Sequence, residues 1–330
     1  MVAVDCFADQ QQLCRTLLAT EAQADFAGVG YGWPAGNLGL LDRAAVVVTR
    51  SLHELSGGVA TRLSGAHAVV VTAPWPGSAE EELGGELHVR RVVRALHDDA
   101  LVEERADTEF ALLLALVRRT HALARELHRG QWLPPHAAYR GARRCSGLTV
   151  GFLGLDGSTL PLTRRAAAFG MHTVFVHPLP SARDGGAICE PSEADCALVA
   201  DVVAAGAVAC RSVATLLATA DALLLHSRPE AGTVLGPAEL GSLRGGQFLV
   251  STCPGGLHTH SLLKALHSGH LVGAALDVPD ADAFLEAAAR ETPGLILTQR
   301  AAAHSDDFAH SVAEPAMRAA LAVLRGSATS

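Results

Sequence analysis

The residues from 148 to 178 predict a β-strand, a tight turn, an α-helix and a second strand in succession. An apolar run at 149–153 leads into a glycine-containing turn at 154–157, and a β-branched run follows at 173–176. Pro161 suits the first turn of the helix between them, since a backbone N–H at that place would have no helical acceptor. Such a βαβ unit requires a parallel sheet and has the outline of a dinucleotide-binding site.

The turn departs from the dinucleotide-binding fingerprint at two of its three glycine positions. The fingerprint needs glycine at 154 for the tight turn, at 156 for the approach of the pyrophosphate and at 159 for helix–strand packing. This chain keeps Gly154 but has Asp156 and Thr159 at the other two positions. Because a carboxylate repels a pyrophosphate, we expect NAD(H) to bind weakly or not at all. The alternative is a βαβ unit that closes the fold and binds nothing.

Other residues of this unit are candidates for cofactor contacts. An acid that ends the second strand normally binds the hydroxyls of the adenosine ribose, and His177 occupies that position. A neutral imidazole offers one hydrogen bond there, whereas a carboxylate would accept two. Gly157, Ser158 and Pro178 complete the predicted contact surface.

The composition excludes several classes of protein. The chain has 330 residues, of which 49% are hydrophobic, and this length suggests about two domains with substantial cores. A net charge of -8 and a pI near 6.0 oppose direct binding to nucleic-acid phosphates, so any link to chromatin would pass through protein partners. The amino terminus shows no charged leader and no apolar run reaches membrane-spanning length, so we expect a soluble chain without membrane insertion.

Cysteines and histidines do not form a recognisable metal site. The seven cysteines are scattered without the paired spacing of zinc ligands, which favours buried thiols in a reducing compartment. Four histidines at 258, 260, 267 and 270 lack a nearby carboxylate or cysteine, so we expect a solvated loop and helix end rather than a metal centre.

The order of strand-like and helix-like runs predicts an α/β fold of two doubly wound, Rossmann-like lobes, each a parallel sheet flanked by helices. Residues 1–105 with 302–330 are expected to form a flavodoxin-like, substrate-type lobe, and residues 106–301 a dinucleotide-binding Rossmann lobe. Beyond the βαβ unit, the predicted strands are Val2–Val4, Ala45–Thr49, Ala68–Thr72, Ala222–His226, Gln247–Ser251, Gly273–Asp277 and Leu295–Thr298.

Further helices are predicted, among them short ones over 261–266 and 282–290. A long amphipathic helix should run from Asp107 to Arg129, with acids near its amino end, arginines toward its carboxyl end and Gly130 as its stop. It would bridge the lobes or form part of a subunit interface. A second helix is expected over 193–204, and a third over 306–324, where Pro315 should cause a kink or mark a helix start.

Several long stretches of the chain resemble a known family. They are RADTEFALLLALVRRTHALARELHRGQW, RGARRCSGLTVGFLG, ADALLLHSRPEAGTVLG, GGQFLVSTCPGGL, GHLVGAALDV and LILTQRAAAHSDD. Their order is similar to that in the D-2-hydroxyacid dehydrogenases and, within them, in the C-terminal binding proteins (CtBPs), and the opening VAVDC is similar to that of the plant, ANGUSTIFOLIA-type branch. The resemblance covers nearly the whole chain and implies the D-2-hydroxyacid dehydrogenase fold.

The resemblance also implies where catalytic groups would lie. Active members hold the carboxylate of a 2-keto acid with an arginine and protonate the ketone with a histidine tuned by an acid, while the nicotinamide supplies hydride. The corresponding residues here are Pro254, Asp282 and Arg300. Proline offers no cation, Asp282 is shorter than the usual glutamate, and a guanidinium does not release a proton near neutral pH. His304 lies in a different helical phase, so we expect no intact catalytic set.

Other cofactor-facing positions of the family are retained. The resemblance places His226 and Ser227 at the end of one strand, Thr252 and Cys253 after another, and Asp277 where an aspartate meets the nicotinamide carboxamide. Capping of strand ends is their alternative role.

Two functions follow from the resemblance. A catalytically silent CtBP-like homodimer would be a scaffold or regulator in corepression, cytoskeletal or cell-shape processes, in the cytoplasm and also the nucleus of a plant or alga. Its protein partners would bind the first lobe, as short proline-containing peptides do in animal corepressors, or the dimer surface. The alternative is an NAD(P)-dependent oxidoreductase that acts on a 2-hydroxy or 2-keto acid with an altered active site.

Overall fold

The structure, a computed structural model of the chain, comprises two compact units, 1–101 with 304–330, and 102–303. The residues that the structure describes are 2–4, 14, 16, 26–28, 42, 44–49, 66–72, 92–94, 98–134, 137, 140–177, 193–226, 233–252, 256–278, 287–288, 292, 294–299, 301–303 and 305–325.

The first unit is built on a parallel sheet with the strand order β2-β1-β3-β4-β5. This is the order of a flavodoxin-like doubly wound sheet. The predicted strands β1, β3 and β4 are confirmed, whereas β2 and β5 were not predicted. The strands are β1 (Val2–Val4), β2 (Phe26–Gly28), β3 (Val46–Thr49), β4 (Ala68–Val71) and β5 (Val92–Arg94).

The helix α12 (Asp306–Leu324) packs against β3 and β4 of the first unit. Ser305 begins it, since its side chain accepts a hydrogen bond from the Phe308 N–H at 3.0 Å. The apolar side of α12, including Met317 at 0% exposure, lies on the strand valines. The helix continues through Pro315. The prediction that Pro315 marks a helix start is therefore wrong.

The second unit contains a parallel sheet of seven described strands in the order β12-β11-β10-β9-β6-β7-β8. From β6 the chain first builds outward to β7 and β8, and then returns to the other side of β6 with β9, β10, β11 and β12, so the predicted doubly wound sheet is confirmed. The bounds are β6 (Thr149–Leu153), β7 (His172–Val176), β8 (Val208–Ala209), β9 (Ala222–Leu225), β10 (Gln247–Ser251), β11 (Leu271–Val278) and β12 (Leu295–Gln299).

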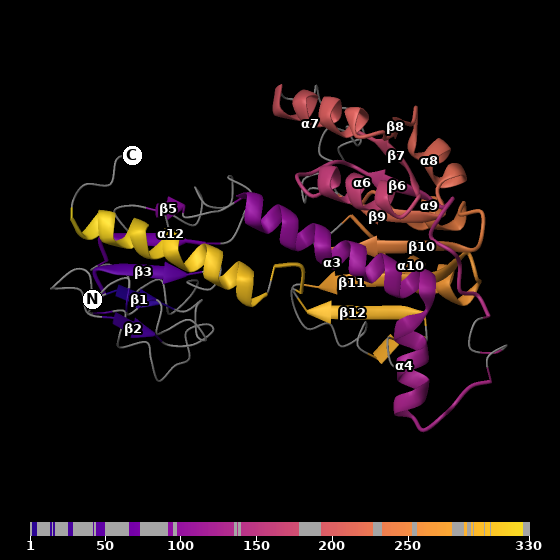
Figure 1. The fold of residues 1–330 in the computed structure, drawn as a ribbon, viewed down its shortest axis with the longest axis horizontal. Helices are drawn as coiled ribbons and strands as arrows, with labels where there is room; N and C mark the ends of the chain where they lie inside the picture. Colours follow the sequence, from indigo (N-terminus) through magenta and orange to yellow (C-terminus); the bar gives the residue numbers. More distant parts are fainter. Residues whose placement is uncertain are drawn as a thin grey trace. The chain divides into compact units, whose positions relative to one another are not determined.

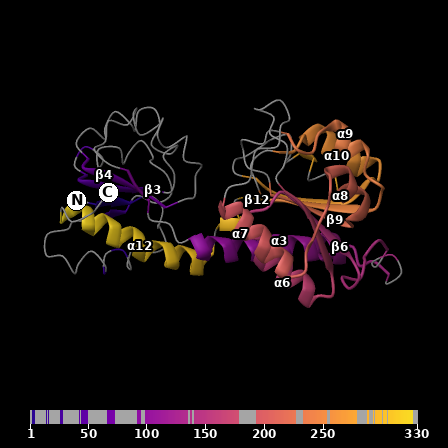
Figure 2. The ribbon, with the colours of Figure 1, turned by 90° about the horizontal axis from the view of Figure 1, so that it is seen from above.

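Helices cover both faces of this second sheet (Figures 1 and 2). On one face lie α3 (Asp98–Arg118), α6 (Thr159–Ala168) and α7 (Glu193–Ala204), and on the other lie α8 (Val213–Thr219), α9 (Pro237–Gly241) and α10 (Thr259–His267). Alternate strand residues point into the two cores, so that Phe152 packs with the first group and Leu153 with the second. A short 3-10 helix, η6, spans Ala301–Ala303. The predicted helices over 193–204 and 306–324 are confirmed.

The predicted single helix from Asp107 to Arg129 is wrong in its extent. The structure has α3, which begins at Asp98, and α4 (Thr120–His128), which projects from the end of α3 (Figure 1). Arg119 separates them because its φ of 57° lies in the left-handed region, which no α-helix accommodates. Gly130 has a φ of 77°, as expected of a residue that ends a helix. No described helix is both long enough and apolar enough to cross a membrane.

Close packing of α8 on β6 requires a glycine in the middle of that strand. A Cβ atom added to Gly151 would lie 2.8 Å from both the Ala220 Cβ and the Leu216 Cδ2. We therefore expect Gly151→Ala to lower the free energy of unfolding by about 1–3 kcal/mol through overpacking, as measured by urea denaturation. Gly241→Ala is the control, since its Cβ would meet no atom within 4 Å. Equal stability of the two variants would contradict this account of the packing.

Candidate functional site

Side chains from several strand ends meet at the point where the strand order reverses. Gly154 and Asp156 follow β6, His226 follows β9, Thr252 follows β10, and Asp277 belongs to the carboxyl end of β11. Gly154 has a φ of 85°, which the tight turn after β6 requires and which glycine adopts without strain. In doubly wound sheets, ligands bind in the crevice at this switch point.

A network of four charged side chains, two buried and two partly exposed, occupies this switch point. The helix α3 supplies Arg105 and Glu109, which meet Asp156 and His226 from the strand ends. The Glu109 Oε2 lies 2.8 Å from the His226 Nε2, and the Arg105 Nη1 lies 2.7 Å from an oxygen of Asp156. The Arg105 Nε also donates to the Glu109 Oε1 at 3.0 Å. Glu109 and His226 have side-chain exposures of only 1%, so these charges depend on one another.

Two threonine hydroxyls complete the network. Thr252 lies between the two α3 side chains: its Oγ1 accepts from the Arg105 guanidinium at 2.9 Å, and its hydroxyl donates to the Glu109 carboxylate. The Thr159 Oγ1 is 2.9 Å from the His226 Nδ1 and accepts the Asp156 N–H at 3.0 Å. These contacts satisfy polar atoms that burial would otherwise leave without hydrogen bonds.

The network holds its members in their charged states. Burial opposes ionisation of Asp156, but His226, Arg105 and hydrogen bonds from Ser158 outweigh it and lower the pKa of Asp156 to about 2. Burial likewise opposes ionisation of Glu109, and the same two cations lower the pKa of Glu109. For His226, burial disfavours the imidazolium, yet the carboxylates of Asp156 and Glu109 raise its pKa. The result is a balanced set of two anions and two cations.

The Asp156 carboxylate also binds the amino end of α6, which is where a dinucleotide pyrophosphate would lie. Its Oδ1 accepts the Ser158 N–H at 3.0 Å and the Ser158 hydroxyl at 2.6 Å. The Thr159 N–H donates to the Asp156 carbonyl oxygen at 3.0 Å, and the Asp156 N–H is held by Thr159. The N–H groups of Asp156, Ser158 and Thr159 are therefore satisfied within the chain.

Gly157, predicted as a cofactor contact, has a packing role in the structure. A Cβ atom at this position would come within 2.6 Å of the Val102 Cγ2 on α3. The absence of a side chain thus lets α3 approach the turn closely, which brings Arg105 within reach of Asp156.

The other described candidates, His177 and Asp277, make their printed contacts outside this network. The His177 Nε2 is 3.6 Å from the Asp195 Oδ1 of α7, so a carboxylate from another element approaches the place where the family has an acid. The oxygens of Asp277 accept hydrogen bonds from the Thr298 hydroxyl at 2.6 Å and from the N–H groups of Ala301 and Ala302 at 2.9 and 3.0 Å. The contacts of Asp277 are those of strand-end capping, the alternative role given above.

The sequence interpretation missed Arg105 and Glu109. It assigned Glu109 to the amino end of a helix, whereas α3 begins at Asp98 and places Glu109 in the middle of its buried face. An acid on the same face as Phe110 and Leu113 was the available signal, because a buried acid requires a cation or donor. Pro178, Ser227, Cys253, Pro254, Asp282, Arg300 and His304 lie outside the residues that the structure describes.

His258, His267 and His270 make hydrogen bonds to nearby backbone groups. The His258 Nδ1 accepts the Ser261 N–H at the start of α10, and His267 and His270 bond to the carbonyl oxygens of Leu263 and Leu243. Among the described residues, no group of three or more metal-ligating side chains is arranged to hold an ion.

The fold and the glycine turn at its switch point define the second unit as a Rossmann-type domain. Residues 110–302 match the family model described as D-isomer specific 2-hydroxyacid dehydrogenase, NAD binding domain. The chain therefore belongs to the D-isomer specific 2-hydroxyacid dehydrogenase family.

The resemblance to the C-terminal binding proteins is also confirmed. The chain is 30% identical over 325 residues to C-terminal binding protein AN of Arabidopsis thaliana. The aligned region covers 96% of this chain and 48% of that protein. It is 28% identical over 190 residues to C-terminal-binding protein 1 of Caenorhabditis elegans, covering 56% of this chain and 24% of the relative. The chain thus spans half or less of the length of these curated relatives.

Solved structures agree on the fold across the whole chain. D-lactate dehydrogenase from Aquifex aeolicus, complexed with NAD and lactic acid, matches with a TM-score of 0.75 at 15% identity, covering 99% of this chain and 96% of that one. The TT0316 protein from Thermus thermophilus matches with a TM-score of 0.72 at 24% identity, covering 98% and 97%. The predicted D-2-hydroxyacid dehydrogenase fold is thereby confirmed.

The raised pKa of His226 makes stability depend on pH. Stabilisation by the imidazolium is fully present below its ordinary pKa of about 6.5 and is lost as the pH rises through the raised value. We expect the free energy of unfolding, measured by urea denaturation over a pH series, to fall across this window. His226→Gln should remove this slope and lower stability by about 3 kcal/mol near pH 6, because Glu109 loses one buried partner but keeps Arg105. The exposed His172→Gln is the control, and an unchanged slope in His226→Gln would refute the assignment.

Proposed function

We propose that this protein is a non-catalytic, CtBP-like scaffold or regulator built on a dehydrogenase fold. The observation that carries the proposal is the Asp156 carboxylate at the amino end of α6. It is bound by Ser158 and paired with Arg105 at 2.7 Å, in the position that a cofactor pyrophosphate needs. The replacement of the family's catalytic arginine and histidine by Pro254 and Arg300 supports the same conclusion.

Charge balance explains why the crevice disfavours a dinucleotide. Entry of a pyrophosphate would add negative charge to a site where Glu109 and Asp156 already neutralise Arg105 and His226. Displacement of Asp156 would break its 2.7 Å ion pair and the hydrogen bonds at the start of α6. NAD(H) binding is therefore weak or absent in this proposal.

Removal of the internal carboxylate should restore anion binding. In Asp156→Gly, the Arg105 guanidinium, the charged His226 and the open N–H groups of α6 would face the pyrophosphate, so we expect NADH to bind at least about tenfold more tightly than in the wild type. Fluorescence titration with NADH measures this change. Asp156→Asn separates the effect of charge from that of space, and Asp201→Asn on the exposed side of α7 is the control. Wild-type affinity equal to that of Asp156→Gly would refute the proposal.

A homodimer accompanies this role. The described residues Leu127 and Trp132, on and just after α4, are large apolar side chains with exposures of 53% and 83%. We propose that a second copy of the chain covers them. Leu127→Glu with Trp132→Glu should halve the mass found by light scattering at micromolar concentration, whereas Val208→Glu, at 62% exposure on β8, should leave it unchanged. A monomeric wild type would contradict this proposal.

A working NAD(P)-dependent oxidoreductase for a 2-hydroxy or 2-keto acid is the second candidate. The match of residues 110–302 to an NAD-binding domain and the retained Asp277 favour it. Robust turnover of a 2-keto acid by the wild type with NADH would support this candidate and remove the scaffold proposal. If the scaffold proposal holds, wild-type turnover should be absent, and activity should appear only after Pro254→Arg and Arg300→His are added to Asp156→Gly. The double variant Asp156→Gly with Pro254→Arg is the control, because it still lacks a proton donor.

A further inference from the structure

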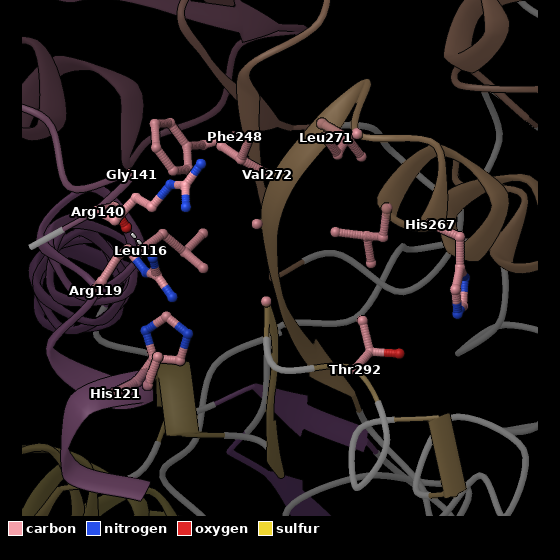
Figure 3. A pocket seen from close by; sticks show the side chains of 15 residues that line it. Leu116, Arg119, His121, Arg140, Gly141, Phe248, His267, Leu271, Val272 and Thr292 are labelled. Atoms are coloured by element: carbon pink, nitrogen blue, oxygen red, sulfur yellow. Dashed lines mark hydrogen bonds between the residues drawn. The ribbon is translucent and has the colours of Figure 1, made fainter. Parts of the chain in front are cut away.

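A cavity lies at the amino ends of strands of the Rossmann sheet, whereas the switch-point residues lie at the carboxyl ends. Its volume is about 550 Å³, and it opens at the amino ends of β10 and β11, where Phe248 and Leu271 line it. The junction of α3 and α4 forms another wall. Figure 3 shows Arg119, Arg140 and His121 on one side of the cavity and Thr292 on the other. A volume of this size is in the range of small-molecule sites.

The lining of this cavity combines an apolar base with cationic groups. Leu116, Phe248 and Leu271 are at most 2% exposed, and they form part of the base. Arg119 and Arg140 supply guanidinium groups, and no carboxylate is present among the described lining residues. Within the described part of the chain, neither of these two arginines forms an ion pair, in contrast to Arg105 at the switch point.

The backbone is arranged to place Arg119 at the cavity. Arg119 is the one described non-glycine residue in the left-handed region, with a φ of 57°, and such a conformation costs free energy that the fold must offset. Its guanidinium donates to the Arg140 carbonyl oxygen. Gly141 makes room for it, because a Cβ atom there would lie 3.2 Å from the Arg119 Nη1. The neighbouring Arg118 instead donates to the Arg143 carbonyl oxygen at 2.7 Å and does not line the cavity.

We propose that this cavity binds a small amphipathic organic anion, with an apolar ring system against the Phe248 and Leu271 side and one carboxylate or phosphate at Arg119 and Arg140. Guanidinium groups bind planar carboxylates and phosphates with paired hydrogen bonds. A neutral apolar ligand would form no ion pair with the two arginines, and a bare inorganic anion would make no apolar contact with Val272, which lines the cavity and is 47% exposed. The site is separate from the switch point, and the proposal does not depend on the absence of NAD(H).

Titration of the full chain with 2-naphthoate tests this site, with the neutral 2-naphthalenemethanol and inorganic phosphate as comparison probes. We expect saturable binding of naphthoate at least about tenfold tighter than that of either comparison probe. Arg119→Gly, which suits the left-handed backbone, and Arg140→Ala should each weaken naphthoate binding about tenfold and leave the alcohol unaffected. Arg129→Ala at the end of α4 is the control, since Arg129 pairs with Glu126 and does not line the cavity.

Three results would overturn the proposal. The first is equal affinity for naphthoate and the alcohol, or no saturable binding of naphthoate by a folded wild type. The second is unchanged naphthoate affinity in both arginine variants. The third is a fall in the light-scattering mass of Arg119→Gly without weaker naphthoate binding, which would make the cavity part of an interface between two copies. Asp156→Gly should leave naphthoate affinity unchanged, and this result keeps the two sites distinct.

Discussion

The ion network between α3 and the ends of β6 and β9 is the interaction on which the Rossmann unit depends most. It joins a helix to two central strands through Arg105, Glu109, Asp156 and His226, all within hydrogen-bonding or ion-pairing distance of a partner. Buried pairs of this kind add little net stability compared with apolar residues, but removal of one member leaves a charge without compensation in a low-dielectric interior. The four residues therefore act as a set, and a change at one alters the protonation and position of the others.

Much of the fold follows from local patterns in the sequence. Apolar runs such as those of β6, β9 and β10 are bounded by turn residues. Helices α7 and α12 match the predicted ranges, and the apolar side of α12 is the one that packs on the sheet. The break at Arg119 was not predicted, because VRRTHALAR contains neither glycine nor proline and continues the helical pattern. Its left-handed backbone depends on contacts with residues 140 and 141, which lie beyond the reach of local pattern analysis.

The site was predicted in part, and the missing part is tertiary. The sequence identified Asp156 as a carboxylate placed where a pyrophosphate would lie. The roles of Arg105 and Glu109 were not predicted. Arg105 pairs with Asp156 from a different element, and the buried position of Glu109 depends on where α3 begins. Both omissions have one cause: the sign of a charge is visible in the sequence, whereas its partner is fixed by packing between distant segments.

The anion at the start of α6 is a side chain of the protein and not a bound ligand, and this difference has a thermodynamic consequence. A free ligand stabilises a folded protein by an amount that rises with the ligand's concentration, so the thermal stability of many dinucleotide-binding proteins follows the supply of the cofactor. The anion at the start of α6 is part of this polypeptide, and its effective concentration is set by the length of the turn after β6. Under the proposed function, the stability of this Rossmann unit would therefore not follow the concentration of NAD(H).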